Sequence, residues 1–189
     1  MRLTIILSFL LLSFGAICQS EDADLYYTKT GYAHFFSSAP LEDIEAENND
    51  LISFFNKKTG KVIYEVTIKR FEFEKSLMQE HFNEKYLESD KYPKSTFKGF
   101  VKDIDAIDFD TPGTYDATAD GTLDIHGVEQ ERTIEGTITV NDDGSISVEA
   151  KFPVILEDHK VKIPKMVVKN IAEVVDVTVK FDYEVYTKE

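Results

Sequence analysis

The stretch EKSLMQEHFNEKYLESDKYPKSTFKGFV, residues 74–101, is the only long segment of this 189-residue chain with a clear helical pattern. Its apolar side chains recur every three or four residues, and the opposite face carries mainly Glu and Lys. This spacing predicts an amphipathic helix with one buried face. The residues of the apolar stripe are Leu77, Met78, His81, Phe82 and Tyr86.

Pro93 separates this helix from the strand that follows. Proline has no backbone N–H and biases Tyr92 toward extended conformations, so the helix cannot continue through it. A strand is expected from about Ser95. A single helix with one apolar stripe needs a sheet surface or a barrel opening to cover.

The rest of the chain reads as strands whose apolar and polar residues alternate. The expected strands are residues 26–37, 50–55, 61–70, 95–103, 114–126, 133–140, 145–154 and 175–185. The acidic segment 41–49 is expected to be a loop or a short extended piece. About eight one-faced strands without a βαβ rhythm predict an all-β fold, either an antiparallel barrel or a sandwich.

Two blocks of sequence resemble the YceI-like family. One is the helix MQEHFNEKYLES, residues 78–89, followed by KYPKSTFKG, and the other is GTLDIHGV, residues 121–128. The resemblance extends over about residues 28–186, and Ser37-Ser38-Ala39-Pro40 departs from the Gly-Phe pair of the main branch, as in a divergent branch. It implies an eight-stranded, lipocalin-like antiparallel barrel that binds a long isoprenoid or other lipid chain, with the helix over one opening.

Whether such a barrel is hollow depends on small residues in its most regular strand. Ala117, Ala119 and Gly121 occupy consecutive inward positions, where a packed interior would favour large aliphatic residues. The alternative is that they lie at strand bends or beneath bulky neighbours such as Tyr64 and Phe97. The residues alone leave both readings open, and the resemblance favours a cavity. In that case Ala119→Phe should fill the cavity without the ~1–3 kcal/mol cost of overpacking.

A ligand-binding barrel would use two sets of residues. The expected cavity lining is Tyr64, Val66, Ile68, Phe97, Ala117, Ala119, Gly121 and Leu123. The expected lid is Leu77, Met78, His81, Phe82 and Tyr86, with His81 and Asn83 as polar contacts to a head group.

No motif in the chain points to catalysis or to a cofactor. Cys18 is the only cysteine, which excludes an internal disulfide or a multi-cysteine metal site. His81 lies beside Glu80 and Glu84 and could bind a metal or serve a hydrolase, but a hydrogen bond between the helix and the barrel is favoured. The aspartates of residues 103–110 lack the spacing of a calcium loop. We therefore expect no enzyme, no bound metal and no cofactor.

The first 18 residues have the pattern of a secretory signal peptide. Arg2 precedes an apolar run, residues 3–17, that is short for a membrane span. Cleavage after Cys18 would leave one domain, residues 19–189. The alternative is a lipoprotein with lipidated Cys18, but Ile17 stands where such signals usually have Gly or Ala. An exported protein, periplasmic or secreted, is therefore expected.

The chain is strongly acidic, with a formal net charge of −14. This charge disfavours nucleic-acid binding because phosphates would be repelled. The expected function is to sequester or carry a hydrophobic small molecule, an isoprenoid or other lipid amphiphile. The alternative is a solid-core barrel that contacts another extracytoplasmic protein. The oligomeric state stays open.

Overall fold

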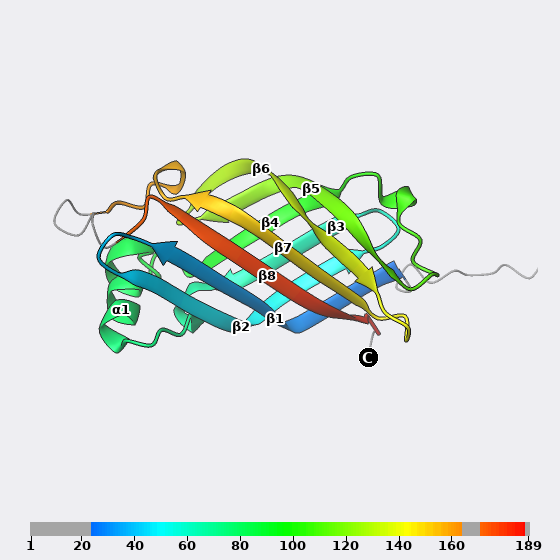
Figure 1. Cartoon of the computed structure of the whole chain (residues 1–189), viewed down its shortest axis with the longest axis horizontal. Helices are drawn as coiled ribbons and strands as arrows, with labels where there is room; N and C mark the ends of the chain where they lie inside the picture. Colours follow the sequence, from blue (N-terminus) through cyan, green and yellow to red (C-terminus); the bar gives the residue numbers. More distant parts are fainter. Residues whose placement is uncertain (1–23, 164–170, 188–189) are drawn as a thin grey trace, which may run out of the picture.

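The computed structural model describes residues 24–163 and 171–187, which form a closed eight-stranded antiparallel barrel (Figure 1). The strands are β1 (Leu25–Ser38), β2 (Asp43–Asn56), β3 (Lys61–Thr67), β4 (Lys94–Val101), β5 (Gly113–Ile125), β6 (Val128–Val140), β7 (Ile146–Ile155) and β8 (Val174–Val185). Each strand pairs with the next, and β8 pairs with β1 to close the wall. The predicted all-β, lipocalin-like barrel is confirmed.

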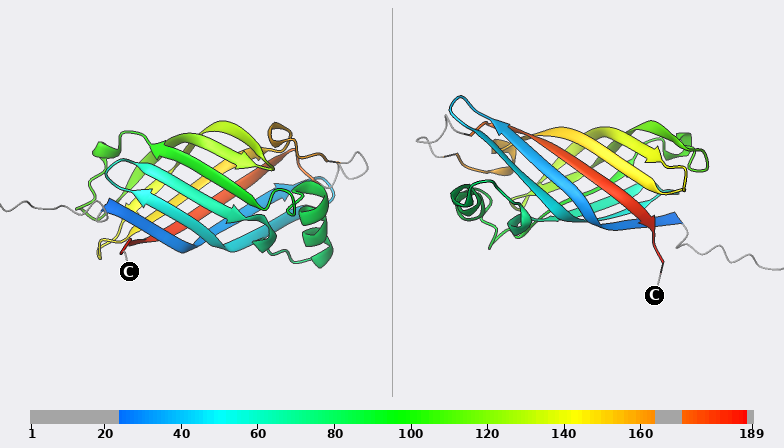
Figure 2. Two further views of the ribbon diagram at one scale, coloured as in Figure 1. Left: turned by 180° about the vertical axis from the view of Figure 1, so that it is seen from behind. Right: turned by 60° about the horizontal axis from the view of Figure 1, so that its bottom comes forward.

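The two ends of the barrel differ, as Figures 1 and 2 show. One end, which we call the helix end, carries α1 (Ser76–His81), the β1–β2 turn, the β5–β6 turn and the β7–β8 connection. The other end, the closed end, carries the start of β1 and the end of β8. In the part of the chain that the structure describes, no helix is long and apolar enough to cross a lipid bilayer. The expected signal peptide, residues 1–18, lies outside the described residues.

Strand alternation places the apolar residues inside, as the sequence predicts. In β8, Val175, Val179, Phe181 and Tyr183 are buried, and Lys180 between them is exposed. Successive strand residues point to opposite faces, so every second residue enters the interior. The same period in all eight strands gives one continuous apolar core.

β2 is longer than predicted, because the acidic segment 41–49 is mostly strand. Ile44, Ala46 and Asn48 point inward and pair across to β1, while the carboxylates between them face solvent. The alternation was present, but the three Glu and Asp side chains on the outer face gave the segment the composition of a loop. The expected loop is therefore wrong here, and the expected extended piece is part of a long strand.

The predicted helix is present but short. α1 continues into a π-helical turn, Phe82–Tyr86, in which the Leu87 N–H donates to the carbonyl of Phe82 at 2.9 Å. The backbone then leaves the helix at Glu88, whose φ of 43° lies in the left-handed region. The helical segment therefore ends at Tyr86, seven residues before Pro93, rather than at Pro93. We call α1 and the π-helical turn together the lid.

His126 and Gly127 form the two-residue turn between β5 and β6, with φ of 56° and 68°. Positive φ at both positions suits the twist of an antiparallel hairpin, and β6 accordingly begins at Val128, five residues earlier than predicted. The His126 ring lies 2.8 Å from a Glu88 carboxylate oxygen through Nε2 and 3.2 Å from the His159 carbonyl through Nδ1. His126 thereby connects the β5–β6 turn with Glu88, which follows the lid, and with the β7–β8 connection.

Aromatic side chains fill the interior toward the closed end. Phe55 packs between Tyr183 and Phe109, with ring centroids 6.0 Å apart in both pairs. Phe109 and the buried Ile107 come from the β4–β5 connection and close this end. The Tyr183 hydroxyl lies 2.6 Å from Ser53 Oγ, and burial raises the pKa of Tyr183 above its ordinary value.

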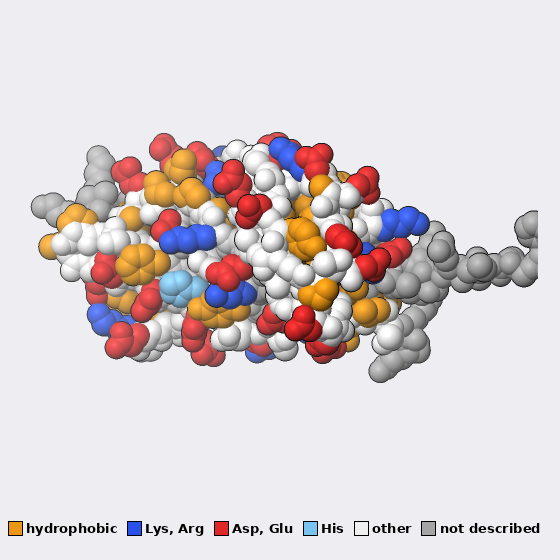
Figure 3. Space-filling view, turned by 45° about the vertical axis from the view of Figure 1, so that its right-hand side comes forward, with side chains coloured by type: hydrophobic (Ala, Val, Ile, Leu, Met, Phe, Trp, Pro, Cys, Tyr) orange, Lys and Arg blue, Asp and Glu red, His pale blue; other side chains and the backbone are white. Residues whose placement is uncertain are grey.

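The outer surface is predominantly acidic. Figure 3 shows Asp and Glu side chains spread over one face, with Lys and Arg between them. Cross-strand pairs such as Lys180–Glu149, 3.2 Å apart, are well exposed. Exposed pairs of this kind contribute little to stability, so the barrel depends mainly on its apolar interior.

Candidate functional site

A cavity of about 310 Å³ occupies the barrel interior at the helix end. Its wall consists of inward residues from the strands, and its roof comes from the lid and the β7–β8 connection. The strand residues of the wall are Ala33, Phe35, Ser37, Ile44, Tyr64, Val66, Ser95, Leu123, Ile125, Phe152, Val154, Val175, Val177 and Val179. The lining is almost entirely apolar, so the cavity favours a hydrocarbon chain over a polar solute.

One aromatic cluster holds the lid on the barrel. Phe82 stacks on Phe35 of β1, with ring centroids 5.4 Å apart and an interplanar angle of 18°. It also packs against Phe71 and Phe73, at 5.6 and 5.0 Å. Phe71 and Phe73 lie between β3 and α1, so the segment that leads into the lid also packs against it. The lid therefore covers the cavity, and a small apolar contact holds it on the barrel.

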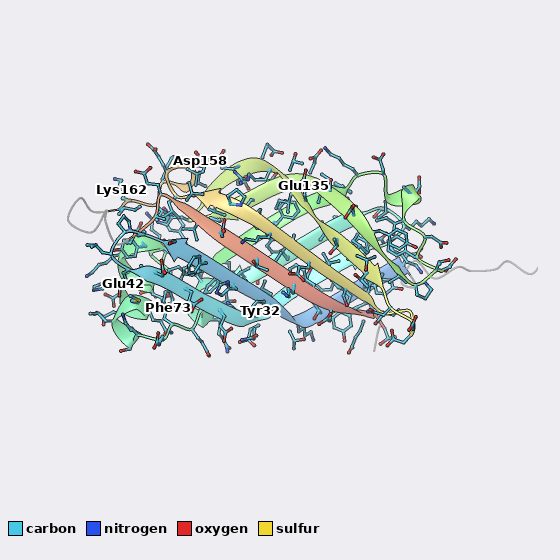
Figure 4. The ribbon with its side chains drawn as sticks, viewed as in Figure 1. Tyr32, Glu42, Phe73, Glu135, Asp158 and Lys162 are labelled. Carbon is cyan, nitrogen blue, oxygen red and sulfur yellow. The ribbon has the colours of Figure 1, made fainter. Side chains whose placement is uncertain are left out.

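Three polar residues of the β1–β2 turn and the lid, Glu42, His81 and Tyr86, line the cavity at the helix end, which we call its mouth. The Lys75 ammonium donates to Glu42 Oε1 at 2.7 Å, and this hydrogen bond raises the pKa of Lys75 above its ordinary value. Glu42 and Phe73 are labelled at the helix end in Figure 4. His81 and Tyr86 of the lid line the same region, and burial raises the pKa of Tyr86. A ligand head group at the mouth would meet these side chains.

Tyr64 forms the floor of the cavity. Its ring is buried between Phe97, stacked at 5.4 Å, and Phe181, at 5.5 Å. Burial raises the pKa of the Tyr64 phenol well above its ordinary value, so it stays neutral. Beyond this floor lies a second space of only about 60 Å³.

The structure brings eight of the predicted residues together around the main cavity. They are Tyr64, Val66, Ile68, Met78, His81, Phe82, Tyr86 and Leu123. Phe97, Ala117 and Ala119 line the small space instead, together with Tyr64. The interior is thus hollow at the helix end and nearly filled elsewhere, so each of the two readings of the sequence describes one half. Contact of these residues with a ligand stays a prediction.

Three predicted residues lie away from both spaces. Leu77 lies on the outward side of α1 and is 60% exposed. The Asn83 side chain donates to the Gln79 carbonyl at 2.9 Å within the lid, and its Oδ1 is buried without a hydrogen-bond partner among the described residues. Gly121 lies opposite Gly99 on β4, under the Phe97 ring. A Cβ there would come within 2.4 Å of the Lys98 carbonyl, so close strand packing, rather than ligand space, requires this glycine.

Sequence reasoning missed several residues of the cavity. Val175 and Val177 were visible as inward positions of the last strand, but nothing singled them out as lining. Glu42 and Ile44 were missed because residues 41–49 looked like a loop. Leu156, Val161 and Ile171 lie in the β7–β8 connection, where no periodic pattern could have indicated a roof.

The structure describes two features that bear on metal binding. Among residues 24–163 and 171–187, no group of three His, Cys, Asp or Glu side chains could hold a metal ion. In the aspartate-rich loop, Asp108 accepts hydrogen bonds from the Asp110 N–H at 3.0 Å and from the Thr111 hydroxyl at 2.7 Å. These bonds lower the pKa of Asp108. Its carboxylate therefore stabilises the loop.

Comparisons with known proteins agree with this architecture. The YceI-like domain family matches residues 38–184. A polyisoprenoid binding domain from Saccharophagus degradans, implicated in plant cell wall breakdown, shares 14% identity and a TM-score of 0.74, over 87% of this chain and 99% of that one.

Two further solved structures share 14% identity with this chain. Burkholderia cenocepacia BcnA has a TM-score of 0.67, over 82% of this chain and 96% of its own. The Campylobacter jejuni YCEI protein has a TM-score of 0.52, over 100% and 94%. No curated protein matches the sequence. Because the family match spans most of the sequence, this chain belongs to the YceI-like family.

Proposed function

We propose that this protein binds one amphiphile, with its apolar chain in the main cavity and its head group at the mouth, and carries or sequesters it outside the cytoplasm. The chain would be an isoprenoid or another lipid tail. Each buried methylene contributes ~0.8 kcal/mol, before the cost of ordering the ligand is subtracted. The protein would act by binding alone, without a catalytic step.

The observation that carries this proposal is an apolar cavity of about 310 Å³ whose lining at the helix end includes the polar residues Glu42, His81 and Tyr86. A volume of this size is at the lower bound of ordinary ligand sites, ~300–1,000 Å³. The name of the related polyisoprenoid binding domain from Saccharophagus degradans supports an isoprenoid-like ligand. The signal-like leader of the sequence supports an extracytoplasmic location.

A mass spectrum of an organic extract of the purified protein tests the proposal first. The expected result is one amphiphile, or one homologous series, in near-stoichiometric amount. Protein stripped of this material should then bind an environment-sensitive dye and release it when an amphiphile is added. A stripped protein that binds neither dye nor amphiphile would contradict the proposal and favour a protein-interaction module.

The variant Val177→Phe ties binding to the cavity. Val177 lines the cavity between Phe35 of β1 and Phe152 of β7, so a phenyl group there should occupy ligand space. We expect dye and amphiphile affinity to fall at least about tenfold, ~1.4 kcal/mol. Thr178→Phe adds the same side chain to the outer face, one position further, and should bind as wild type does. Equal affinity in both variants would place the ligand elsewhere.

A further inference from the structure

The interior contains two spaces that meet at one internal wall. Among the described residues, the main cavity and the small space share three lining residues, Tyr64, Phe152 and Val179. These residues come from β3, β7 and β8, so the wall spans the barrel from one side to the other. It divides an open half from a nearly filled half.

The size of the main cavity limits what can enter. An apolar cavity of ~150 Å³ holds a benzene ring, and the main cavity has about twice that volume. This scales to an apolar tail of roughly a dozen carbons. The small space of about 60 Å³ is below the size of one ring. A longer tail could continue past the wall only if the wall were removed.

We propose that Tyr64 sets the maximum length of the apolar tail by blocking the barrel at its middle, so that the protein selects amphiphiles with a short tail of roughly a dozen carbons. This inference rests on the proposed function and adds the class of ligand. Tyr64 is the largest of the three wall residues, and the rings of Phe97 and Phe181 fix it in place.

Small residues line part of the space beyond the wall, and large ones such as Phe55, Ile138 and Tyr183 line the rest. Ala117 and Ala119 of β5 and Gly136 of β6 line the small space. A tail that passed Tyr64 would therefore find room only beside the small residues of this space.

The test measures affinity for a homologous series of straight-chain 1-alkanols, from octanol to hexadecanol, by displacement of a dye from stripped protein. In wild type, affinity should rise roughly fourfold per methylene and stop rising at about a dozen carbons. We call the chain length at which affinity stops rising the break. In Tyr64→Leu, affinity should continue to rise beyond the wild-type break. Leu123→Val is the matched control, because Leu123 lines only the main cavity, and its break should stay within one carbon of wild type.

Two further variants keep the test decisive. If Tyr64→Leu does not fold, Val179→Ala thins the same wall and should also move the break to longer alkanols. Ala119→Phe, added to Tyr64→Leu, fills the small space and should return the break to its wild-type length. An unchanged break in every folded wall variant would overturn the inference. Alkanol binding without any break would also overturn the inference but would leave the proposed function intact. A stripped protein that binds no alkanol at all would contradict the proposed function itself.

Discussion

His159 is the most completely buried imidazole among the described residues, at 1% exposed. It lies in the β7–β8 connection, and its Nδ1 is 3.0 Å from the Val128 carbonyl, which can only accept a hydrogen bond. Burial lowers its pKa below the ordinary value of 6.5, and the nearby Arg132 acts in the same direction. The folded protein therefore disfavours protonation of this side chain.

The buried His159 predicts a loss of stability in mild acid. As pH falls below about 6.5, the unfolded chain binds a proton at this position that the folded chain excludes. The free energy of unfolding should decrease by at most ~1.4 kcal/mol per pH unit from this one group. Urea titrations of wild type and His159→Asn at several pH values measure the effect. Asn can still donate to Val128 but does not titrate, so its curve should be flatter. Parallel curves would contradict the prediction.

The sequence predicts residues well where a local pattern carries the information. Tyr64, Val66 and Leu123 were assigned to the interior because strand alternation fixes the side on which a residue lies. Alternation gives no information on depth along the barrel axis, so Ala117 and Ala119 were assigned to the same cavity as Val66. The internal wall was not predicted either, because it depends on packing between β3, β7 and β8, which are distant in sequence.

At the scale of elements, the lid is held to the barrel by partly buried side chains alone. No residue of α1 is buried, and Phe82 is the aromatic residue through which the lid contacts Phe35, Phe71 and Phe73. Elements with few buried contacts are those that open at low free-energy cost. We expect the ligand to enter and leave beneath the lid.

Phe82→Ala should loosen the lid without unfolding the barrel. We expect the ligand dissociation rate to rise several-fold. The free energy of unfolding should fall by less than the ~3–5 kcal/mol typical of a core Phe→Ala change, because Phe82 is only partly buried. Stopped-flow release of a bound dye measures the first quantity and urea denaturation the second. Leu77→Ala, on the exposed side of the same helix, is the control and should change neither. An unchanged dissociation rate in Phe82→Ala would mean that the ligand leaves by another route.

The strands were predicted better than their ends. All eight were expected near their observed positions, because one face of each is apolar. β2 and β6 begin earlier than expected. In β2 the acidic outer face at Asp43–Glu47 obscures Ile44 and Ala46, whereas in β6 the positions that continue the alternation of Ile134 are the polar Arg132 and Gln130. The π-helical turn had no signal, because the residues at helical spacing fit an ordinary helix equally well.

At the scale of the whole molecule, export is the prediction that the sequence makes most directly. Intact mass spectrometry of protein from its native host should show a chain that begins at Gln19 and carries no acyl group. The expectation follows from the apolar run at residues 3–17 and from Ile17 before the single cysteine. A diacylglyceryl adduct on Cys18 would instead identify a membrane-anchored lipoprotein, and an uncleaved chain would contradict export by this route.

The pairing of the first and last strands places both ends of the described chain at the same end of the barrel. Tyr26 lies opposite Val185, so the described chain both begins and ends at the closed end of the barrel, away from the mouth (Figures 1 and 2). An affinity tag or biotin attached directly to either end of the described chain would hold the barrel on a sensor surface with its mouth toward the flowing solution. Immobilisation at either of these two points should therefore give the same ligand kinetics.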